Sequence, residues 1–241
     1  MKVHISRLTI AHANIQGGFT GISKTNDINE LIKSHKVDIM ALNELNLDDK
    51  IDSSTLNIPL THTILRKDRE NSSRGGVGML ISTNLKFTNI DIKTNLKNIE
   101  ALWVKVDCSQ TYICSFYRSN KLCSIDNFVE YMNMCMRRFR GKKVIWIGDI
   151  NIDQNDIKST NYRKLDMTLK SFQLVQVVQG ITRIAKRGKS ISQTTIDVIF
   201  TNCYSGFHSC NVLDERIGDH QAILCKLNNP VSVFDKYQHT K

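Results

Sequence analysis

A carboxylate and an amide stand two residues apart just after an apolar segment near the middle of the chain. Residues 144–147 read VIWI, Gly148 follows, and Asp149 and Asn151 come directly after it. Side chains alternate in direction along an extended chain, so both groups would point the same way. Two polar groups held in this way are suited to a functional site. The alternative is an ordinary turn, because Gly, Asp and Asn are the favoured turn residues.

Two earlier segments place polar residues at strand ends in the same manner. Residues 3–15 alternate as a strand that ends at Asn14, and residues 37–42 read as a buried strand followed by Glu44. An acid just beyond an apolar strand repeats the arrangement seen at Asp149. A solvated loop acid explains Glu44 equally well when that segment is read alone.

An aspartate and a histidine complete this set of polar residues in the last fifth of the chain. Asp197 lies inside the apolar segment TIDVIF, where a buried carboxylate is costly unless it has a partner. Asp219 and His220 stand together at the start of the final predicted strand. A lone histidine would more often be a satisfied core residue, and Tyr117, at the end of the predicted strand 111–117, would more often be a core edge.

Strands and helices alternate along the whole chain, without an internal repeat or a low-complexity segment. Apolar and alternating segments predict further strands at 61–65, 76–82, 85–90, 99–107 and 174–178. Helical spacing predicts helices at 26–35, from Ser124 to about Phe139, and at 160–172. Residues 181–202 read as a hairpin with a cationic tip. This pattern indicates an α/β protein with several antiparallel strand pairs.

Composition limits the class of protein. A length of 241 residues suits one domain, and 41% hydrophobic with 23% charged residues is typical of a globular protein with a real core. Lys and Arg exceed Asp and Glu by 33 to 23, a net charge of +10. That excess favours a polyanionic partner, either nucleic acid or an anionic membrane surface. No apolar run is long enough to span a bilayer or resembles a secretion signal, so we expect an intracellular protein that is neither secreted nor membrane-spanning.

The cysteines and the C-terminal residues give two further expectations. Seven cysteines form no C-x-x-C pair and leave an odd count, so neither a zinc site nor a disulfide framework is indicated, and a reducing compartment is expected. Residues 229–241 turn polar after the last predicted strand. We therefore expect a domain at 1–228, followed by a polar tail or the start of a linker.

The polar residues, taken in order, resemble a known motif set. Asn14, Glu44, Tyr117, GDxN at 148–151, Asp197 and the DH pair at 219–220 are similar to the motifs of the endonuclease/exonuclease/phosphatase superfamily of metal-dependent phosphoesterases. Within it, the chain most resembles the apurinic-like endonuclease domains of LINE-type (non-LTR) retrotransposons. The stretches behind that likeness are RGGVGMLIS at 74–82, FYRSN at 116–120, and the run ITR, TTIDVIFTN and GDHQAI.

The resemblance implies a fold and a site. The fold would be an α/β four-layer sandwich, DNase I-like, of two packed mixed β-sheets flanked by helices. Glu44 would bind the divalent metal, with Asp219 near it and Asn14 assisting. Asp149 would orient or deprotonate the attacking water, and Asn151 would hold the phosphate or the water.

Further residues would contact the DNA. By the same resemblance, His220, fixed by Asp197, would contact the scissile phosphate, and Tyr117 and Asn120 would hold the phosphate group and its leaving oxygen. Thr182 matches a threonine that lies near the DNA strand in the family. The basic residues of the predicted hairpin are additional candidates for DNA binding, with a solvated turn as the alternative: Arg183, Lys186, Arg187 and Lys189.

The activity implied by the resemblance is Mg²⁺-dependent nicking of double-stranded DNA, with Mn²⁺ as a substitute ion. The nick would leave a 3′-hydroxyl for a reverse transcriptase, expected on the same native polypeptide, and the protein would act in the nucleus. Oxygen ligands suit Mg²⁺, which stabilises developing charge while a positioned base activates water. The alternatives are a repair-type abasic-site endonuclease, a lipid phosphatase, against which the basic hairpin argues, and a catalytically weak DNA-binding module of the same fold.

Two positions depart from the family pattern. Gly218 precedes the Asp-His pair where the family commonly has Ser, and Leu45 follows Glu44 where it commonly has Thr. Neither change removes a catalytic group. The missing serine hydroxyl bears on the orientation of the phosphate contact.

Overall fold

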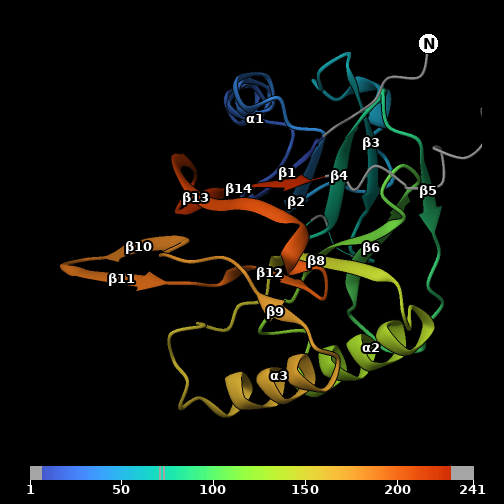
Figure 1. The fold of residues 1–241 in the computed structure, drawn as a ribbon. Coiled ribbons are helices and arrows are strands. Elements are labelled where there is room, and N and C mark those ends of the chain that lie inside the picture. Colours follow the sequence, from blue (N-terminus) through green and yellow to red (C-terminus); the bar gives the residue numbers. More distant parts are fainter. Residues whose placement is uncertain (1–6, 71, 73, 229–241) are drawn as a thin grey trace, which may run out of the picture.

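The computed structural model describes residues 7–70, 72 and 74–228. Two β-sheets pack face to face, with α1 outside one sheet and α2 and α3 outside the other (Figure 1). Residues 229–241, expected from the sequence to form a tail, lie outside the described residues. The expected boundary at 228 therefore stays a prediction.

The first sheet has eight strands within the described residues, in the order β11-β10-β14-β1-β2-β4-β3, with β13 also paired to β14. Its strands are β1 (Arg7–Asn14), β2 (Ile39–Asn43), β3 (His62–Lys67), β4 (Val77–Ser82), β10 (Arg183–Arg187), β11 (Ser190–Thr194), β13 (Phe207–Ile217) and β14 (His220–Asn228). We call it sheet A. It is mixed, because β1 runs parallel to β2 and antiparallel to β14.

The second sheet, sheet B, has six strands within the same described ranges, in the order β5-β6-β7-β8-β12-β9. Its strands are β5 (Phe87–Ile90), β6 (Glu100–Val106), β7 (Thr111–Tyr117), β8 (Lys143–Asp149), β12 (Asp197–Thr201) and β9 (Val175–Gln176). It is also mixed, because β8 runs parallel to β7 and antiparallel to β12.

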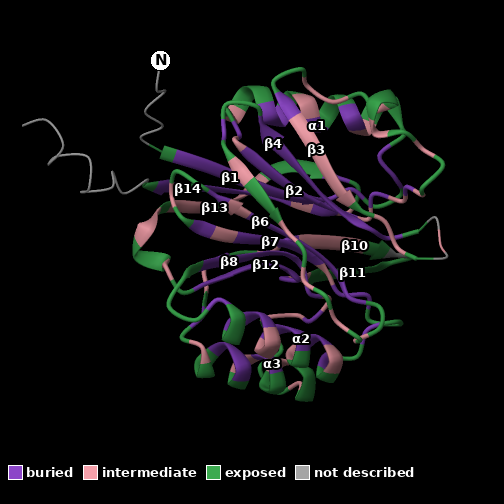
Figure 2. Cartoon of the chain, turned by 90° about the vertical axis from the view of Figure 1, so that its right-hand side faces the viewer, coloured by how far each residue is buried: buried purple, intermediate pink, exposed green. Residues whose placement is uncertain are grey.

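Helices close the outer face of each sheet. They are α1 (Ile22–His35), α2 (Ile125–Arg138) and α3 (Thr160–Ser171), with short 3-10 turns η1 (Ser53–Thr55) and η2 (Tyr204–Gly206). Figure 2 shows buried strands between helices whose outer sides are exposed. This arrangement of α1, sheet A, sheet B and the α2–α3 pair confirms the four-layer, DNase I-like fold.

Strand alternation divides the core into layers. On β1, Leu8 and Ile10 face sheet B, whereas Ala11 and Ala13 face α1. On β8, Trp146 points outward to α2 and stacks edge-on with Phe128. Burying each aliphatic or aromatic side chain stabilises the folded state by roughly 1.5 to 3 kcal/mol. The packing in these three layers therefore holds the sheets and helices together.

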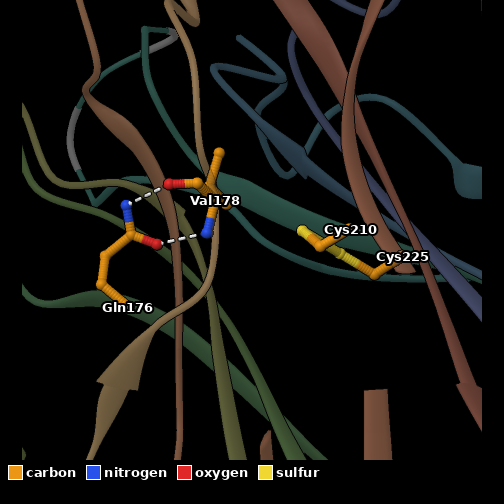
Figure 3. Close-up of a disulfide and its surroundings, with 4 residues drawn as sticks. All are labelled: Gln176, Val178, Cys210 and Cys225. Atoms are coloured by element: carbon orange, nitrogen blue, oxygen red, sulfur yellow. Dashed lines mark hydrogen bonds between the residues drawn. A yellow bond between two sulfur atoms is a disulfide. The ribbon is translucent and has the colours of Figure 1, made fainter. Parts of the chain in front are cut away.

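Several element boundaries differ from those expected, and two of them have a local cause in the hydrogen bonds. Helix α1 begins at Ile22 rather than at 26, because Thr25 lies inside its first turn and bonds back to the Gly21 and Ile22 carbonyls instead of capping. The strand expected at 174–178 shrinks to β9, because the Gln176 side chain bonds both the N–H and the carbonyl of Val178 (Figure 3).

A cross-strand disulfide joins Cys210 of β13 to Cys225 of β14 (Figure 3). The two residues lie opposite one another in the strand register, with Cα atoms 4.2 Å apart. The sequence indicated no disulfide framework, and the structure has this one disulfide. Their spacing of 15 residues carries no recognisable signal, since only the β13–β14 register brings them together.

Candidate active site

The predicted catalytic residues meet at one end of the layer between the sheets. Asn14 ends β1 of sheet A, and Asp149 ends β8 of sheet B. Because β12 runs antiparallel to β8, Asp197 at its start lies directly opposite Asp149. His220 begins β14, beside β1. Both sheets therefore supply acids or bases to one place.

Asp149 is a buried acid of the site, with 1% of its surface exposed. The Asn14 amide donates to its Oδ2 at 2.9 Å, and the Asn151 backbone N–H donates to its Oδ1 at 2.7 Å. Its own backbone N–H donates to Asn43 Oδ1 at 2.8 Å. Burial, followed by the charge of Asp197, raises the pKa of the Asp149 carboxyl to about 7. A carboxylate of that basicity suits general-base catalysis near neutral pH.

Asp197 is fully buried between two histidines. His220 Nδ1 lies 2.8 Å from its Oδ2, and His12 Nε2 lies 3.0 Å from its Oδ1. Burial alone would raise the pKa of Asp197, but the two imidazoles outweigh it and hold that pKa well below the usual range. Burial likewise opposes a charge on His220, but the Asp197 carboxylate outweighs it and raises the pKa of His220 to about 9. At neutral pH this pair is a carboxylate and an imidazolium.

Asp149, Asp197 and His220 form a compact cluster, each offering one atom within 4.8 Å of the others. When Asp149 is ionised, two buried carboxylates and one imidazolium give the cluster a net negative charge. Such a cluster can hold a cation or exchange a proton with a bound water.

Glu44 lies beside this cluster and shares a partner with it. The Asn14 amide donates to Glu44 Oε1 at 3.0 Å as well as to Asp149, so it links the two acids. Glu44 has φ 56°, a left-handed conformation in which strained functional residues are often found. Burial, then the charges of Glu44 and Asp149, raises the pKa of the Tyr117 hydroxyl far above its usual value, so this group is a neutral donor.

Asp219 has one engaged and one bare carboxylate oxygen. Arg183 Nη2 lies 2.7 Å from Oδ2, while Oδ1 is buried and has no hydrogen-bond partner among the described residues. His220 Nε2 lies 3.5 Å from Oδ1, close enough for an ion pair but without a hydrogen bond. A buried carboxylate oxygen without a donor is what a bound cation would satisfy, and the oxygen donors of Glu44, Asp219 and Asn14 fit Mg²⁺ or Mn²⁺.

The two departures from the family pattern have local explanations. Gly218 has φ 79°, and a Cβ there would lie 2.8 Å from Gln16 Oε1, which also accepts from the Asp219 N–H at 3.4 Å. The Gln16 side chain thus occupies the space a serine would need. Leu45 is buried and lies so close to Gly78 that a Cβ on that glycine would be 2.8 Å from Leu45 Cδ1.

Asn151 is held by a buried arginine that was not predicted from the sequence. Its Nδ2 donates to the Arg118 carbonyl at 3.0 Å, and Arg118 Nη2 donates back to the Asn151 carbonyl at 3.2 Å. Arg118 Nε also donates to the Ile150 carbonyl at 2.8 Å. This clamp fixes the loop after β8, while Asn120 is exposed on the loop after β7.

Thr182, expected from the resemblance to lie near the DNA strand, is buried. It has no exposed surface, and its hydroxyl accepts the backbone N–H groups of Ile196 and Asp197, both at 3.0 Å. In the structure Thr182 holds the start of β12 from inside the protein, and its expected role near the DNA strand stays a prediction.

The cationic hairpin is present, as β10 and β11, and it projects from the body of the molecule (Figure 1). Lys186 and Lys189 are exposed, and the turn between the strands contains Gly188 with φ 60°. Arg183 lies at the base of the hairpin, partly exposed and paired with Asp219. Arg187 belongs to β10, but its side chain is outside what the structure describes.

Two further residues of the site were missed. Asn43 holds the Asp149 backbone, and its signal was its place at the end of an apolar strand, directly before Glu44. His12 holds Asp197, and its signal was its spacing of two from Asn14 on the same predicted strand.

The fold and this arrangement of acids, amides and histidine define a phosphoesterase-like protein. Residues 11–209 match the Endonuclease/Exonuclease/phosphatase family, and since they make up most of the chain, the protein belongs to this family. The resemblance inferred from the motifs is thereby confirmed. The comparison with curated proteins gave no match. Among the described residues, no helix is long and apolar enough to cross a membrane.

Solved structures share the fold at low sequence identity. The endonuclease domain of TRAS1, a telomere-specific non-LTR retrotransposon, has TM-score 0.74 and 16% identity, covering 91% of this chain and 98% of that one. The AP endonuclease LMAP from Leishmania major has TM-score 0.76 and 12% identity, with coverages of 93% and 89%. The 3′ phosphatase NExo from Neisseria, bound to product DNA hairpin, has TM-score 0.65 and 16% identity, with coverages of 91% and 99%.

Proposed function

We propose that the protein is a divalent-metal-dependent endonuclease that nicks one strand of double-stranded DNA and leaves a 3′-hydroxyl. The observation that supports this most is the amide of Asn14, which joins Glu44 to Asp149 beside the Asp197–His220 pair. A phosphodiester repels its attacker until its negative charge is neutralised. Here Glu44 could hold a cation, Asp149 could act as the base, and the His220 imidazolium lies next to them.

Glu44 and Asp219, with Asn14 assisting, would hold Mg²⁺ or Mn²⁺, which when bound supplies charge neutralisation to the phosphate and its leaving oxygen. His220 donates its Nε2 proton to a phosphate oxygen, because its Nδ1 is engaged by Asp197. Tyr117 adds a neutral hydroxyl donor next to Glu44. These donors stabilise the charge that builds up on the phosphate.

Asp149 takes the proton from the attacking water. Its pKa of about 7 allows it to be ionised in a useful fraction at neutral pH while remaining basic enough to accept a proton. Asn151, held by Arg118, orients the water or the phosphate through the side-chain oxygen that no described residue engages.

The DNA lies across the site and against the hairpin β10–β11. A net charge of +10 supports a polyanionic substrate, and the exposed Lys186 and Lys189 stand on an element that projects from the body. A β-ribbon of this kind can enter a groove, and basic side chains in a narrow minor groove read its shape. Asn120 contributes a further polar contact near Tyr117.

We further propose that the nick primes a reverse transcriptase on the same native polypeptide, and that the protein acts in the nucleus. The support is the likeness in fold and coverage to the TRAS1 endonuclease domain, together with the motif stretches at 74–82 and 116–120.

A second candidate function is cleavage at abasic sites. It is favoured by the similar fold of AP endonucleases from Leishmania major and Archaeoglobus fulgidus. A catalytically weak DNA-binding module is the third, and the buried acids argue against it, because a domain that only binds DNA has no need of unneutralised carboxylates facing a phosphate.

Supercoiled plasmid separates these functions. With Mg²⁺ or Mn²⁺ the protein should convert it to open circles, EDTA should stop the reaction, and the ends should be extendable by a polymerase. Cleavage that persists in EDTA would contradict the metal-dependent mechanism. A strong preference for abasic over intact duplex would favour the repair function, and binding without nicking under any divalent ion would establish the binding module.

A further inference from the structure

His12 is a buried polar residue in an otherwise apolar row. It shares with Leu8 and Ile10 the face of β1 that looks into the layer between the sheets, and Asn14 ends that row. None of its surface is exposed. An imidazole among isoleucine and leucine side chains is costly to bury unless it bonds to something. Its place therefore requires a specific partner.

That partner is Asp197, on the opposite sheet. An ionised carboxylate only accepts hydrogen bonds, so His12 Nε2 donates to Oδ1 across 3.0 Å, as His220 Nδ1 donates to Oδ2 across 2.8 Å. The remaining His12 nitrogen, Nδ1, is buried without a hydrogen-bond partner in the described part of the chain. The contact with Asp197 is thus the only hydrogen bond of the His12 side chain within those residues.

Resting on the proposed nuclease function, we propose that His12 is a positioning residue that fixes the Asp197 carboxylate. With both oxygens engaged, the carboxylate cannot rotate about its Cβ–Cγ bond. Oδ2 then stays on His220 Nδ1, and His220 Nε2 stays on the side of Asp219 Oδ1, 3.5 Å away, where the proposed function requires the phosphate. Without His12, Oδ1 is a bare buried oxygen, and the carboxylate turns to share the His220 proton between its two oxygens.

The backbone of Asp197 has a separate anchor. Thr182 Oγ1 accepts the Asp197 N–H at 3.0 Å, and β12 is paired with β8 through Asp197 and four further residues. Replacing His12 should therefore leave the strand in place and change only how the carboxylate is oriented.

Two substitutions separate orientation from packing. His12→Gln keeps an N–H donor of similar reach, whereas His12→Leu keeps the bulk and removes the donor. His62→Gln is the matched control, because His62 is also buried in sheet A but bonds the Val37 carbonyl, away from the site.

The first readout is the imidazole NMR spectrum of the metal-free protein at one fixed pH, which does not depend on cleavage. The hydrogen-bonded His220 Nδ1 proton should persist in wild type, His12→Gln and His62→Gln, and should be lost to exchange in His12→Leu. A retained signal in His12→Leu would overturn the inference.

The second readout is nicking of plasmid with Mg²⁺. His12→Leu should lower kcat by ~10 to 100-fold, the size of a small misplacement of a catalytic group, with the Kd for DNA unchanged. His12→Gln should stay within about threefold of wild type. Equal loss in both variants would make His12 a packing residue. If His12→Leu does not fold, His12→Asn, whose amide is too short to reach Oδ1, replaces it. A wild-type protein that does not nick would refute the proposed function, while the NMR comparison would still decide the role of His12.

Discussion

Arg183 and Asp219 form an ion pair, Nη2 to Oδ2 at 2.7 Å, where the hairpin β10–β11 joins the sheet. Arg183 lies opposite His220 in the strand register, so one arginine connects the base of the hairpin with a proposed metal ligand. Its guanidinium occupies one oxygen of a carboxylate whose other oxygen is bare.

Arg183→Gln should tighten the binding of Mn²⁺ to the DNA-free protein. The guanidinium competes with Mn²⁺ for the Asp219 carboxylate and repels the ion by its charge. At an effective dielectric constant near 20, removing such a charge should raise the affinity for Mn²⁺ by on the order of tenfold. Titration followed by the Mn²⁺ electron spin resonance signal measures this. Arg137→Gln, an exposed position on α2, serves as control. An unchanged affinity would mean that Arg183 does not compete with the ion.

Asp149→Asn and His220→Ala should each reduce nicking by about 10² to 10⁴, the usual contribution of a positioned acid or base. The Kd for DNA should stay within a few-fold of the wild-type value, because neither residue belongs to the cationic hairpin. Gel assays of plasmid nicking measure the first, and fluorescence anisotropy the second. Asp126→Asn, an exposed acid on α2, should be neutral. Near-normal nicking by either site variant would remove the assignment.

The metal-free protein should lose stability as the pH rises from 6 to 9. His220 has a folded pKa raised to about 9, so its stabilising contribution is complete below the unfolded pKa of 6.5 and disappears as pH rises through 9. The pKa of Asp149 is raised from 3.8 to about 7, so this group also lowers the stability as the pH rises between those values, which covers the lower part of the range. Together they should lower Tm by roughly 5 °C in EDTA. His220→Gln should flatten the curve above pH 7, and a wild-type Tm that rises over this range would contradict these protonation states.

Replacing Lys186, Arg187 and Lys189 by Ser should weaken DNA binding in a salt-dependent manner. For every phosphate that a removed cation had neutralised, the slope of log affinity against log salt falls by about 0.9. A charge-matched control replaces Lys33, Arg137 and Lys170, which are exposed on the helices. The nick positions on one labelled duplex should also change if the hairpin reads groove shape. An unchanged slope with unchanged nicks would show that the hairpin stays in solvent.

Gly218→Ser, which restores the residue common in the family, should destabilise this chain by about 1 to 2 kcal/mol. Its φ of 79° disfavours a side chain, and the new Cβ would lie 2.8 Å from Gln16 Oε1. Adding Gln16→Ala should recover part of the loss by removing the clash but not the backbone strain. Thermal unfolding of both variants tests this, and a serine variant as stable as wild type would mean that the loop adjusts freely.

Local patterns were enough to predict many of the strands and helices and the α/β class. Alternation identified β1, with Asn14 at its end, and β7, and apolar segments followed by polar residues located Glu44 and Asp149 near strand ends. The order of the motifs then supplied the sandwich, which spacing alone does not encode.

The parts that escaped prediction depend on contacts between distant segments. The hydrogen bond from the Asp149 backbone to Asn43 crosses between the sheets, and the Cys210–Cys225 pair follows from the register of two strands. Thr182 matches a family motif, but its neighbours in the sequence do not show that its hydroxyl bonds the start of β12. Arg118 could not be recognised from the sequence, because a buried arginine whose side chain donates only to backbone carbonyls has no sequence feature that distinguishes it from a surface arginine.

The place of β14 in the chain determines when the site can exist. This strand is the last described element, yet it lies inside sheet A, between β1 and β10, and it brings His220. A ribosome-bound chain that has not yet released residues 220–228 lacks both the histidine and an interior strand of one sheet. Under the proposed function, a chain still being synthesised therefore has no nuclease activity until translation has passed residue 228.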